Sequence, residues 1–327
     1  MRAFLMAAGK GTRLAPLTHV IPKPALPVGN EPVMSRLLRL LARHGVRDVV
    51  ANSAYLADVL EGIVGDGSAQ GLHLTWSREP HPLGTAGGMK FAEASLRSGD
   101  EPVLVLSGDG LHDADLSAMV ASHRASGAMA TIGLIPVTDV TEYGVVVLND
   151  NQRVVAFQEK PAAAEAVSNL ANTGIYIFEP GVFDLLPAAG EMYEFGPQLF
   201  PRMLIEQLPI HGFTLNGYWN DIGSHAAFRD ASLALLDGRL GTEGDDAQQL
   251  VHPTAIVESG AELIGPCVIG PHAHVATGAR IARSVILPGT RIEQGALLAG
   301  SVVGDAAGLA AWASELSHAH VSLDGVS

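Results

Sequence analysis

The chain has a single cysteine, Cys267, among 327 residues and no apolar run long enough to cross a membrane as a helix. One thiol excludes an internal disulfide and suits a reducing compartment, so we expect a cytoplasmic location. The first apolar run is too short for a signal peptide. Basic residues are also scarce, because 20 Lys and Arg stand against 34 Asp and Glu, giving a formal net charge of −14. This charge opposes binding to nucleic acid or to an anionic membrane.

A glycine-rich loop follows the first apolar run. Residues 9–24 read Gly-Lys-Gly-Thr-Arg-Leu-Ala-Pro-Leu-Thr-His-Val-Ile-Pro-Lys-Pro. The carboxyl end of a strand is where a parallel sheet usually holds its ligand. Gly9 and Gly11 let backbone N–H groups approach phosphate oxygens, while Arg13 and Lys23 add positive charge. The pattern indicates binding of a triphosphate.

Two other phosphate-binding motifs do not fit this loop. A Walker A loop needs Ser or Thr after its lysine, but Gly11 follows Lys10. A dinucleotide-binding turn needs a small residue where Leu14 stands. The loop instead resembles the signature of sugar-1-phosphate nucleotidylyltransferases, G-x-G-T-R-L-x-P-L-T-x-x-x-P-K-P, over its whole length. Ala8 replaces a glycine that is common in that family.

The segment up to Leu240 alternates short apolar runs with amphipathic stretches. This pattern predicts an α/β domain with a Rossmann-like, mostly parallel mixed sheet covered on both faces, and we assign residues 1–240 to it. After residue 128, four β-rich runs are spaced like an insertion that roofs the sheet and holds the acceptor substrate. The predicted helices are 33–44, 56–63 and 224–240; the predicted strands are 3–6, 49–51, 72–76, 103–106, 130–135, 145–148, 154–157 and 174–178.

A different period begins after a polar linker at 241–249. Apolar residues recur every six positions from Val251 to Leu287, and a second column of mostly small residues runs from Ala255 to Val285. Such hexapeptide repeats predict a parallel β-helix of about three coils at 250–327, with Trp312 near its cap. The β-helix that many members of the resembled family carry is left-handed, and we expect it to support a homo-oligomer.

Two aspartates match the metal-binding positions of the family. Asp109 follows the apolar run Val103–Leu106, and Asp221 lies in Trp-Asn-Asp-Ile-Gly at 219–223. Carboxylates together with substrate phosphates suit Mg²⁺, which prefers hard oxygen ligands. Alone, each aspartate would be an ordinary turn residue. The resemblance therefore implies Mg²⁺ as cofactor and Asp109, together with Arg13, Lys23 and Lys160, as catalytic.

Further motifs match the sugar-phosphate site. In Phe-Gln-Glu-Lys-Pro at 157–161, the resemblance implies that Lys160 binds the sugar phosphate and Glu159 a sugar hydroxyl. The matches at Tyr143-Gly144 and at Asn172 imply a lining for the sugar pocket. Without this context, a Glu-Lys pair is usually solvated surface. The predicted substrates are thus a nucleoside triphosphate and a sugar 1-phosphate.

The segment Glu-Pro-His-Pro-Leu-Gly-Thr-Ala-Gly at 79–87 resembles the base-binding loop of mannose-1-phosphate guanylyltransferases. A carboxylate at Glu79 accepts from N1–H and the N2 amino group of guanine, whereas uracil or thymine needs a group that both donates and accepts. A solvent-facing Glu79 is the alternative interpretation. The residues implied for nucleotide binding are Ala8, Gly9, Gly11, Thr12, Arg13, Glu79, Gly84 and Thr85.

Other readings remain open. UTP, dTTP or ATP with glucose 1-phosphate, or a heptose or cyclitol phosphate, would fit the same framework. A regulatory paralogue without activity is a second alternative, although Arg13, Lys23, Asp109 and Asp221 are all present. A third gives the β-helix acyltransferase activity through His272 and His274, but three coils look short for an acyl site.

Overall fold

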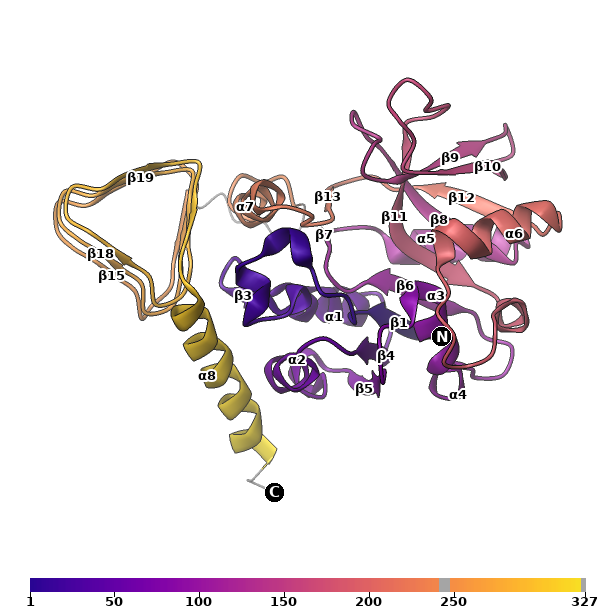
Figure 1. The fold of residues 1–327 in the computed structure, drawn as a ribbon, viewed down its shortest axis with the longest axis horizontal. Helices are drawn as coiled ribbons and strands as arrows, with labels where there is room; N and C mark the ends of the chain where they lie inside the picture. The colour runs from indigo at the N-terminus through magenta and orange to yellow at the C-terminus, as the bar shows by residue number, and fades with distance from the viewer. Residues whose placement is uncertain (241–247, 325–327) are drawn as a thin grey trace.

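The computed structural model describes residues 1–240 and 248–324, with side chains to residue 318. Its centre is a nine-stranded sheet in which β5, β4, β1 and β6 are parallel neighbours (Figure 1). The chain runs outward from β1 to β4 and β5 and then returns to the other side of β1 at β6, which creates a topological switch point. These strands are β1 (Arg2–Met6), β4 (Asp48–Ser53), β5 (His73–Arg78) and β6 (Val103–Ser107).

The remaining strands extend this sheet instead of roofing it. β11 (Leu170–Phe178) lies antiparallel to β6 and pairs on its other edge with β8 (Ala130–Pro136), which pairs in parallel with β12 (Ile210–Thr214). Only the hairpin of β9 (Gly144–Leu148) and β10 (Val154–Glu159) branches away, from the first residues of β11. The predicted insertion is therefore wrong as a separate layer, because β11 is long enough to pair with β6 and with β9 in succession.

Helices and short turns complete the domain. Two small ladders, β2 (Pro27–Val28) with β3 (Glu31–Pro32) and β7 (Leu111–His112) with β13 (Trp219–Asn220), join its loops. The helix predicted over 224–240 ends earlier, at Ala234, and Ser224 caps it by accepting from Ala227 N. The helices are α1 (Val33–Arg43), α2 (Ala57–Val64), α3 (Gly84–Phe91), α4 (Glu93–Leu96), α5 (Leu116–Ser126), α6 (Phe200–Ile205) and α7 (His225–Ala234), and the turns are η1 (Thr12–Leu14), η2 (Leu17–His19), η3 (Lys23–Ala25), η4 (Ser68–Gln70), η5 (Pro180–Leu185) and η6 (Phe195–Leu199).

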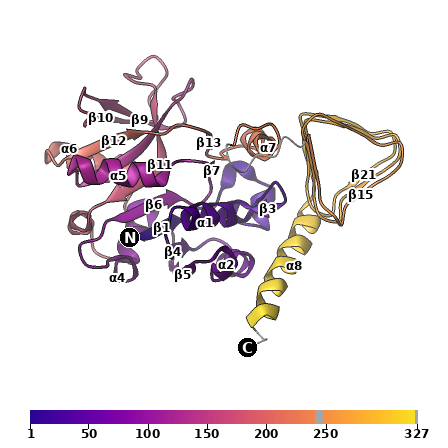
Figure 2. The ribbon, with the colours of Figure 1, turned by 180° about the vertical axis from the view of Figure 1, so that it is seen from behind.

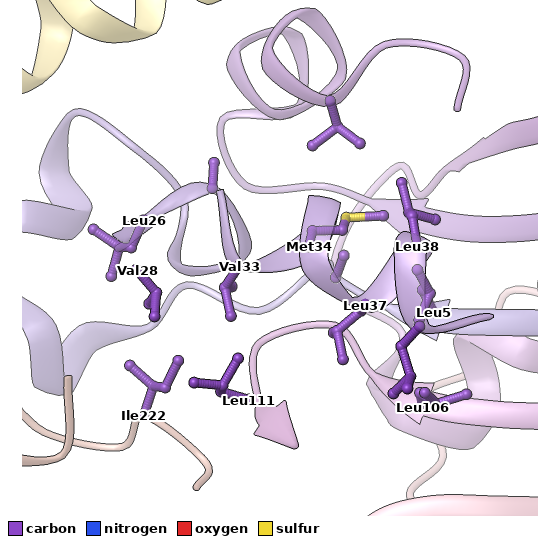
Figure 3. Close-up of a cluster of buried hydrophobic side chains, with 14 of the residues drawn as sticks. Leu5, Leu26, Val28, Val33, Met34, Leu37, Leu38, Leu106, Leu111 and Ile222 are labelled. Atoms are coloured by element: carbon purple, nitrogen blue, oxygen red, sulfur yellow. The ribbon is translucent and has the colours of Figure 1, made fainter. Parts of the chain in front are cut away.

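One apolar core lies beneath the glycine-rich loop. Figure 3 shows side chains from the sheet, from α1, from the segment after the loop and from the segment near Asp221 meeting in one cluster. Leu26 and Val28 come from the segment that follows the glycine-rich loop, and Ile222 comes from the segment near Asp221. All three are at most 1% exposed. Packing therefore fixes the two chain segments that carry Lys23 and Asp221 relative to each other.

The C-terminal part contains the predicted parallel β-helix. Figure 1 shows it end-on, with its stacked coils forming a triangle. Within the described part of the chain, its three faces carry four, three and three parallel strands. The strands are β14 (Gln249–Val251), β15 (Ile256–Val257), β16 (Glu262–Ile264), β17 (Cys267–Ile269), β18 (His274–Val275), β19 (Arg280–Ala282), β20 (Val285–Ile286), β21 (Arg291–Ile292), β22 (Leu297–Ala299) and β23 (Val302–Val303).

The six-residue period is broken twice, because the second and third coils are each 17 residues long instead of 18. Val251 stacks on Ile269, 18 residues on, but Ile269 stacks on Ile286, only 17 residues on. The predicted places of Leu287 and Val285 in the two columns are therefore wrong. Both belong to the large apolar cluster of the N-terminal domain, while Ile286 continues the internal column.

The β-helix also ends earlier than predicted. From Ala306 to Asp324 the chain forms the helix α8, which contains Trp312. Part of the linker predicted at 241–249 lies outside the described residues, and Gln249 already belongs to β14. Among the described residues, no helix combines the length and apolar character that a membrane-spanning segment requires.

Candidate active site

The glycine-rich loop begins directly after β1 and folds against Lys23. Gly11 has a left-handed φ of 61°, and a Cβ there would lie 2.9 Å from Lys23 Cβ. Glycine is therefore required at this position by both backbone conformation and space. Thr18 Oγ1 donates to the Gly11 carbonyl at 3.0 Å, which closes the loop on itself.

Lys23 links the two predicted metal aspartates. Its side chain is only 10% exposed, and its Nζ lies 2.6 Å from Asp109 Oδ2 and donates to the Asp221 backbone carbonyl at 2.7 Å. Ser107 Oγ donates to Asp109 Oδ1 at 2.5 Å. Three loops far apart in sequence thus meet at one point at the carboxyl ends of β1 and β6.

A cavity of about 280 Å³ opens beside this point and contains the predicted base-binding residue. Glu79 is 5% exposed, so the solvent-facing alternative is wrong. Its Oε1 accepts from Asn52 Nδ2 at 2.6 Å and its Oε2 accepts from Leu83 N at 2.9 Å. Asn52 Oδ1 accepts in turn from Ala7 N at 2.6 Å, which ties Glu79 to the start of the glycine-rich loop. Burial raises the pKa of Glu79, opposed by these hydrogen bonds.

The far wall of this cavity comes from the segment before η6. Glu194 Oε2 accepts from Thr85 N at 3.0 Å and from Thr85 Oγ1 at 2.6 Å. Gly84, Thr85, Met192 and Glu194 all line the cavity, together with the predicted residues Ala8, Gly9 and Gly11.

A second cavity, of about 250 Å³, shares the Lys23–Asp109 pair with the first. It is lined by Gly11, Thr12 and Arg13, so it continues the first cavity toward the loop's cationic side. Arg13 Nη1 lies 2.7 Å from Glu142 Oε2, and Arg13 Nη2 lies 3.9 Å from Asp221 Oδ2. The polar lining and the charges suit a phosphate chain.

The predicted sugar residues lie on the other side of Asp221. Tyr143 and Asp221 line a third cavity of about 430 Å³, where Tyr143 packs edge-on against Trp219 with ring centroids 5.3 Å apart. Burial, with a further contribution from Asp221, raises the pKa of Tyr143 to about 12. Tyr143 O accepts from Lys160 N at 3.1 Å, which places the backbone of the E-K-P motif next to this wall.

The other four predicted sugar-site residues differ in their surroundings. Gly144 pairs with Glu159 between β9 and β10, and burial of the carboxylate raises the pKa of Glu159. Lys160 is exposed at the end of β10. Asn172 uses both ends of its side chain locally: Nδ2 donates to Tyr176 OH at 2.9 Å and Oδ1 accepts from Gly174 N at 3.1 Å. It shapes the irregularity in β11, so its contact with sugar stays a prediction.

Asp109 and Asp221 share a small cavity of about 30 Å³ with Ser107 and Trp219. Their carboxylates are hard donors, and Mg²⁺ commonly takes one or two carboxylates and completes its shell with substrate phosphates and water. The donor set therefore fits that ion. His112 also lines this cavity; it is 6% exposed, and neither ring nitrogen has a hydrogen-bond partner among the described residues. Burial lowers the pKa of His112 to about 4, so the ring is neutral.

Three residues in the site escaped the sequence analysis. Asn52 is the last residue but one of β4, and a polar residue at the carboxyl end of a buried parallel strand was a usable signal. Ser107 is the last residue of β6, another buried parallel strand. Glu194 contacts Thr85 from 109 positions away, and no local pattern announces that contact.

Comparison with known proteins agrees with this geometry. Residues 2–238 match the family described as nucleotidyl transferase, and residues 246–322 match the GMPPB C-terminal domain. The chain is 37% identical to a UTP–glucose-1-phosphate uridylyltransferase of Synechocystis sp., covering 93% of this chain and 87% of that protein. It is 36% identical to a mannose-1-phosphate guanylyltransferase of Mycobacterium tuberculosis, covering 90% and 82%.

A solved structure shares the fold. A Bacillus anthracis protein described as a glucose-1-phosphate thymidylyltransferase, crystallised with sucrose, superposes with a TM-score of 0.65 at 24% identity. The match covers 74% of this chain and 98% of that one. With the two family matches and the two relatives, these findings assign the chain: it belongs to the sugar-1-phosphate nucleotidyltransferase family.

Proposed function

We propose that this enzyme transfers the guanylyl group of GTP to mannose 1-phosphate and releases pyrophosphate. The observation that carries the proposal is the meeting of the two nucleotide cavities at Lys23 and Asp109. A base in the first cavity and a triphosphate in the second place the α-phosphate at their junction. The M. tuberculosis relative supports this substrate pair.

The residues would act as follows. Arg13 and Lys23 neutralise the triphosphate and the departing pyrophosphate, and Lys160 holds the phosphate of the sugar. An oxygen of that phosphate attacks the α-phosphorus as the bond to pyrophosphate breaks in line with it. Positioning and charge stabilisation supply most of the rate enhancement in phosphoryl transfer. Asp109 and Asp221 would hold Mg²⁺, which when bound neutralises charge developing on the phosphate oxygens.

Guanine fits the hydrogen-bonding of Glu79. Asn52 and Leu83 occupy one lone pair on each carboxylate oxygen, which orients the carboxylate and leaves further lone pairs for the N1–H and the amino group of guanine. Burial removes competing water, so each hydrogen bond to the base counts more.

UTP with glucose 1-phosphate is the second candidate. The Synechocystis relative is named for that pair. The burial of Glu79, which is 5% exposed, also bears on this pair, because burial raises the pKa of the carboxyl and makes its protonated form less costly. A protonated Glu79 presents one donor and one acceptor, which is the pattern that uracil needs.

The test is pyrophosphate release with Mg²⁺, measured for GTP, UTP, dTTP, ATP and CTP against mannose and glucose 1-phosphates. The highest kcat/KM with GTP and mannose 1-phosphate would support the proposal. A different best pair would replace the substrates and keep the reaction. No release with any pair would contradict this proposal and favour a cyclitol or heptose phosphate acceptor, or a regulatory role.

A further inference from the structure

The C-terminal helix α8 packs on the segment that follows the glycine-rich loop. It leaves the last coil of the β-helix and runs back alongside α2, as both views show (Figures 1 and 2). It also contacts η2, which lies between Arg13 and Lys23. Leu309 and Trp312 of α8 are 0% and 4% exposed, and they belong to the same apolar cluster as Leu17 of η2. The family motifs give this helix no role.

The two helices approach closely at one glycine. A Cβ at Gly62 in α2 would lie 2.8 Å from Ser317 Oγ and 3.3 Å from Ser317 Cβ. The Ser317 hydroxyl can rotate away from a methyl group, but a branched side chain at this position would also meet Ser317 Cβ and push α8 away. The position of α2 is therefore coupled to the position of α8.

Tyr55 connects this interface to the glycine-rich loop. It precedes α2, and its hydroxyl donates to the Thr18 carbonyl at 2.8 Å. Thr18 is 2% exposed, and its own hydroxyl donates to the Gly11 carbonyl at 3.0 Å. Gly11 packs on Lys23, whose ammonium meets Asp109. Every link from α2 to the site is thus a direct contact.

We propose that α8 braces the phosphate-binding loop, with Tyr55 and Thr18 as positioning residues that transmit its packing. A loop rich in glycine loses much conformational freedom when it wraps a phosphate chain, and prior ordering reduces that loss. The inference rests on the proposed function only in that the ligand is the triphosphate. The β-helix then serves the site by delivering α8, in addition to any role in assembly.

The first test compares the complete wild-type chain with Tyr55→Phe by amide hydrogen exchange without nucleotide. The variant removes one hydroxyl, and amides of residues 11–23 should exchange about two- to tenfold faster, as for one lost hydrogen bond. Exchange in β8 and β12 should not change. Equal exchange of residues 11–23 in both proteins would overturn the relay through Tyr55.

The second test inserts a wedge between the helices. Gly62→Leu should speed exchange in the same loop and raise KM for the nucleoside triphosphate about three- to tenfold, with KM for the sugar phosphate unchanged. Ala311→Leu is the matched control, since Ala311 is on the exposed side of α8. If Gly62→Leu speeds amide exchange in α8 but leaves exchange of residues 11–23 and the KM for the nucleotide unchanged, the proposal that α8 orders the loop would be overturned. Because exchange is read without substrate, a failed substrate assignment would leave this result intact.

Discussion

At the scale of single residues, the site is built from acidic groups whose roles their neighbours decide. Asp109 lies 2.6 Å from a nearly buried ammonium, whereas Glu79 is buried among neutral donors. Lys23 pairs with the first carboxylate, while burial makes ionisation of the second more costly. In the proposed reaction the same chemical group, a carboxylate, would thus serve charge stabilisation at Asp109 and base recognition at Glu79.

Asp109→Asn tests the first role. The substitution keeps the shape of the side chain but removes the charge that pairs with Lys23 and would bind Mg²⁺, so we expect kcat/KM to fall at least about a hundredfold. Asp150→Asn is the control, because Asp150 lies on an exposed turn. Matching far-UV circular dichroism would show that the variant is folded. A loss of less than tenfold would contradict the assignment of Asp109.

Glu79→Gln tests the second role. An amide can no longer accept from both donor groups of guanine, so the ratio of kcat/KM for GTP over UTP should fall about tenfold or more. The control is Glu61→Gln, whose carboxylate accepts from Ser53 Oγ outside the nucleotide cavity. An unchanged ratio would show that Glu79 does not recognise the base.

The raised pKa of Glu79 gives this ratio a pH dependence. As the pH falls, more Glu79 is protonated, which removes an acceptor for guanine and adds a donor for uracil. The wild-type preference for GTP should therefore weaken at lower pH, while Glu79→Gln should show a flat ratio. A preference that strengthens on acidification would contradict the assignment.

At the scale of elements, the sequence predicts the parallel core well because buried strands and amphipathic helices have strong local periods. The prediction fails where an element takes two partners or loses a residue. β11 pairs first with β9 and then with β6, and the second and third coils of the β-helix are each one residue shorter than the first. The pairing of β11 and the shortened coils both depend on contacts between residues far apart in the sequence, which a local pattern does not reveal. The same limit hid Glu194, whereas Lys23 and Asp109 could be predicted from the resemblance.

The loop between β8 and β9 carries an element-scale prediction. Glu142 on this loop holds Arg13 at 2.7 Å, with both side chains more than half exposed. Glu142→Gln should free Arg13 for the triphosphate and lower KM for the nucleotide about two- to fivefold at low salt, the range expected for an exposed ion pair. Salt should shrink the difference by screening. Glu165→Gln, on another exposed loop, is the control, and a raised KM would show that Glu142 assists nucleotide binding instead.

At the scale of the whole molecule, the two parts of the chain share one core. A single apolar cluster contains Leu5 of β1, Phe228 of α7, Val268 of β17 and Trp312 of α8. Asn30 Nδ2 donates to Ile269 O at 3.1 Å, and Arg229 donates to the Gly300 carbonyl. These contacts do not depend on the predicted oligomer, which stays a prediction. The β-helix therefore packs as part of the same core as the N-terminal domain, although its coils also stack on one another.

A shared core predicts one cooperative unfolding transition, and Cys267 provides the probe. This lone cysteine is fully buried inside the β-helix, so its thiol reacts with a labelling reagent only when the coils open. In a urea series, the midpoint of Cys267 labelling should coincide with the midpoint from far-UV circular dichroism, which follows the helices of the catalytic domain. Cys267→Ser gives the background of the labelling reaction. Labelling complete at a lower urea concentration would show that the β-helix opens alone and that the shared cluster does not couple the two parts.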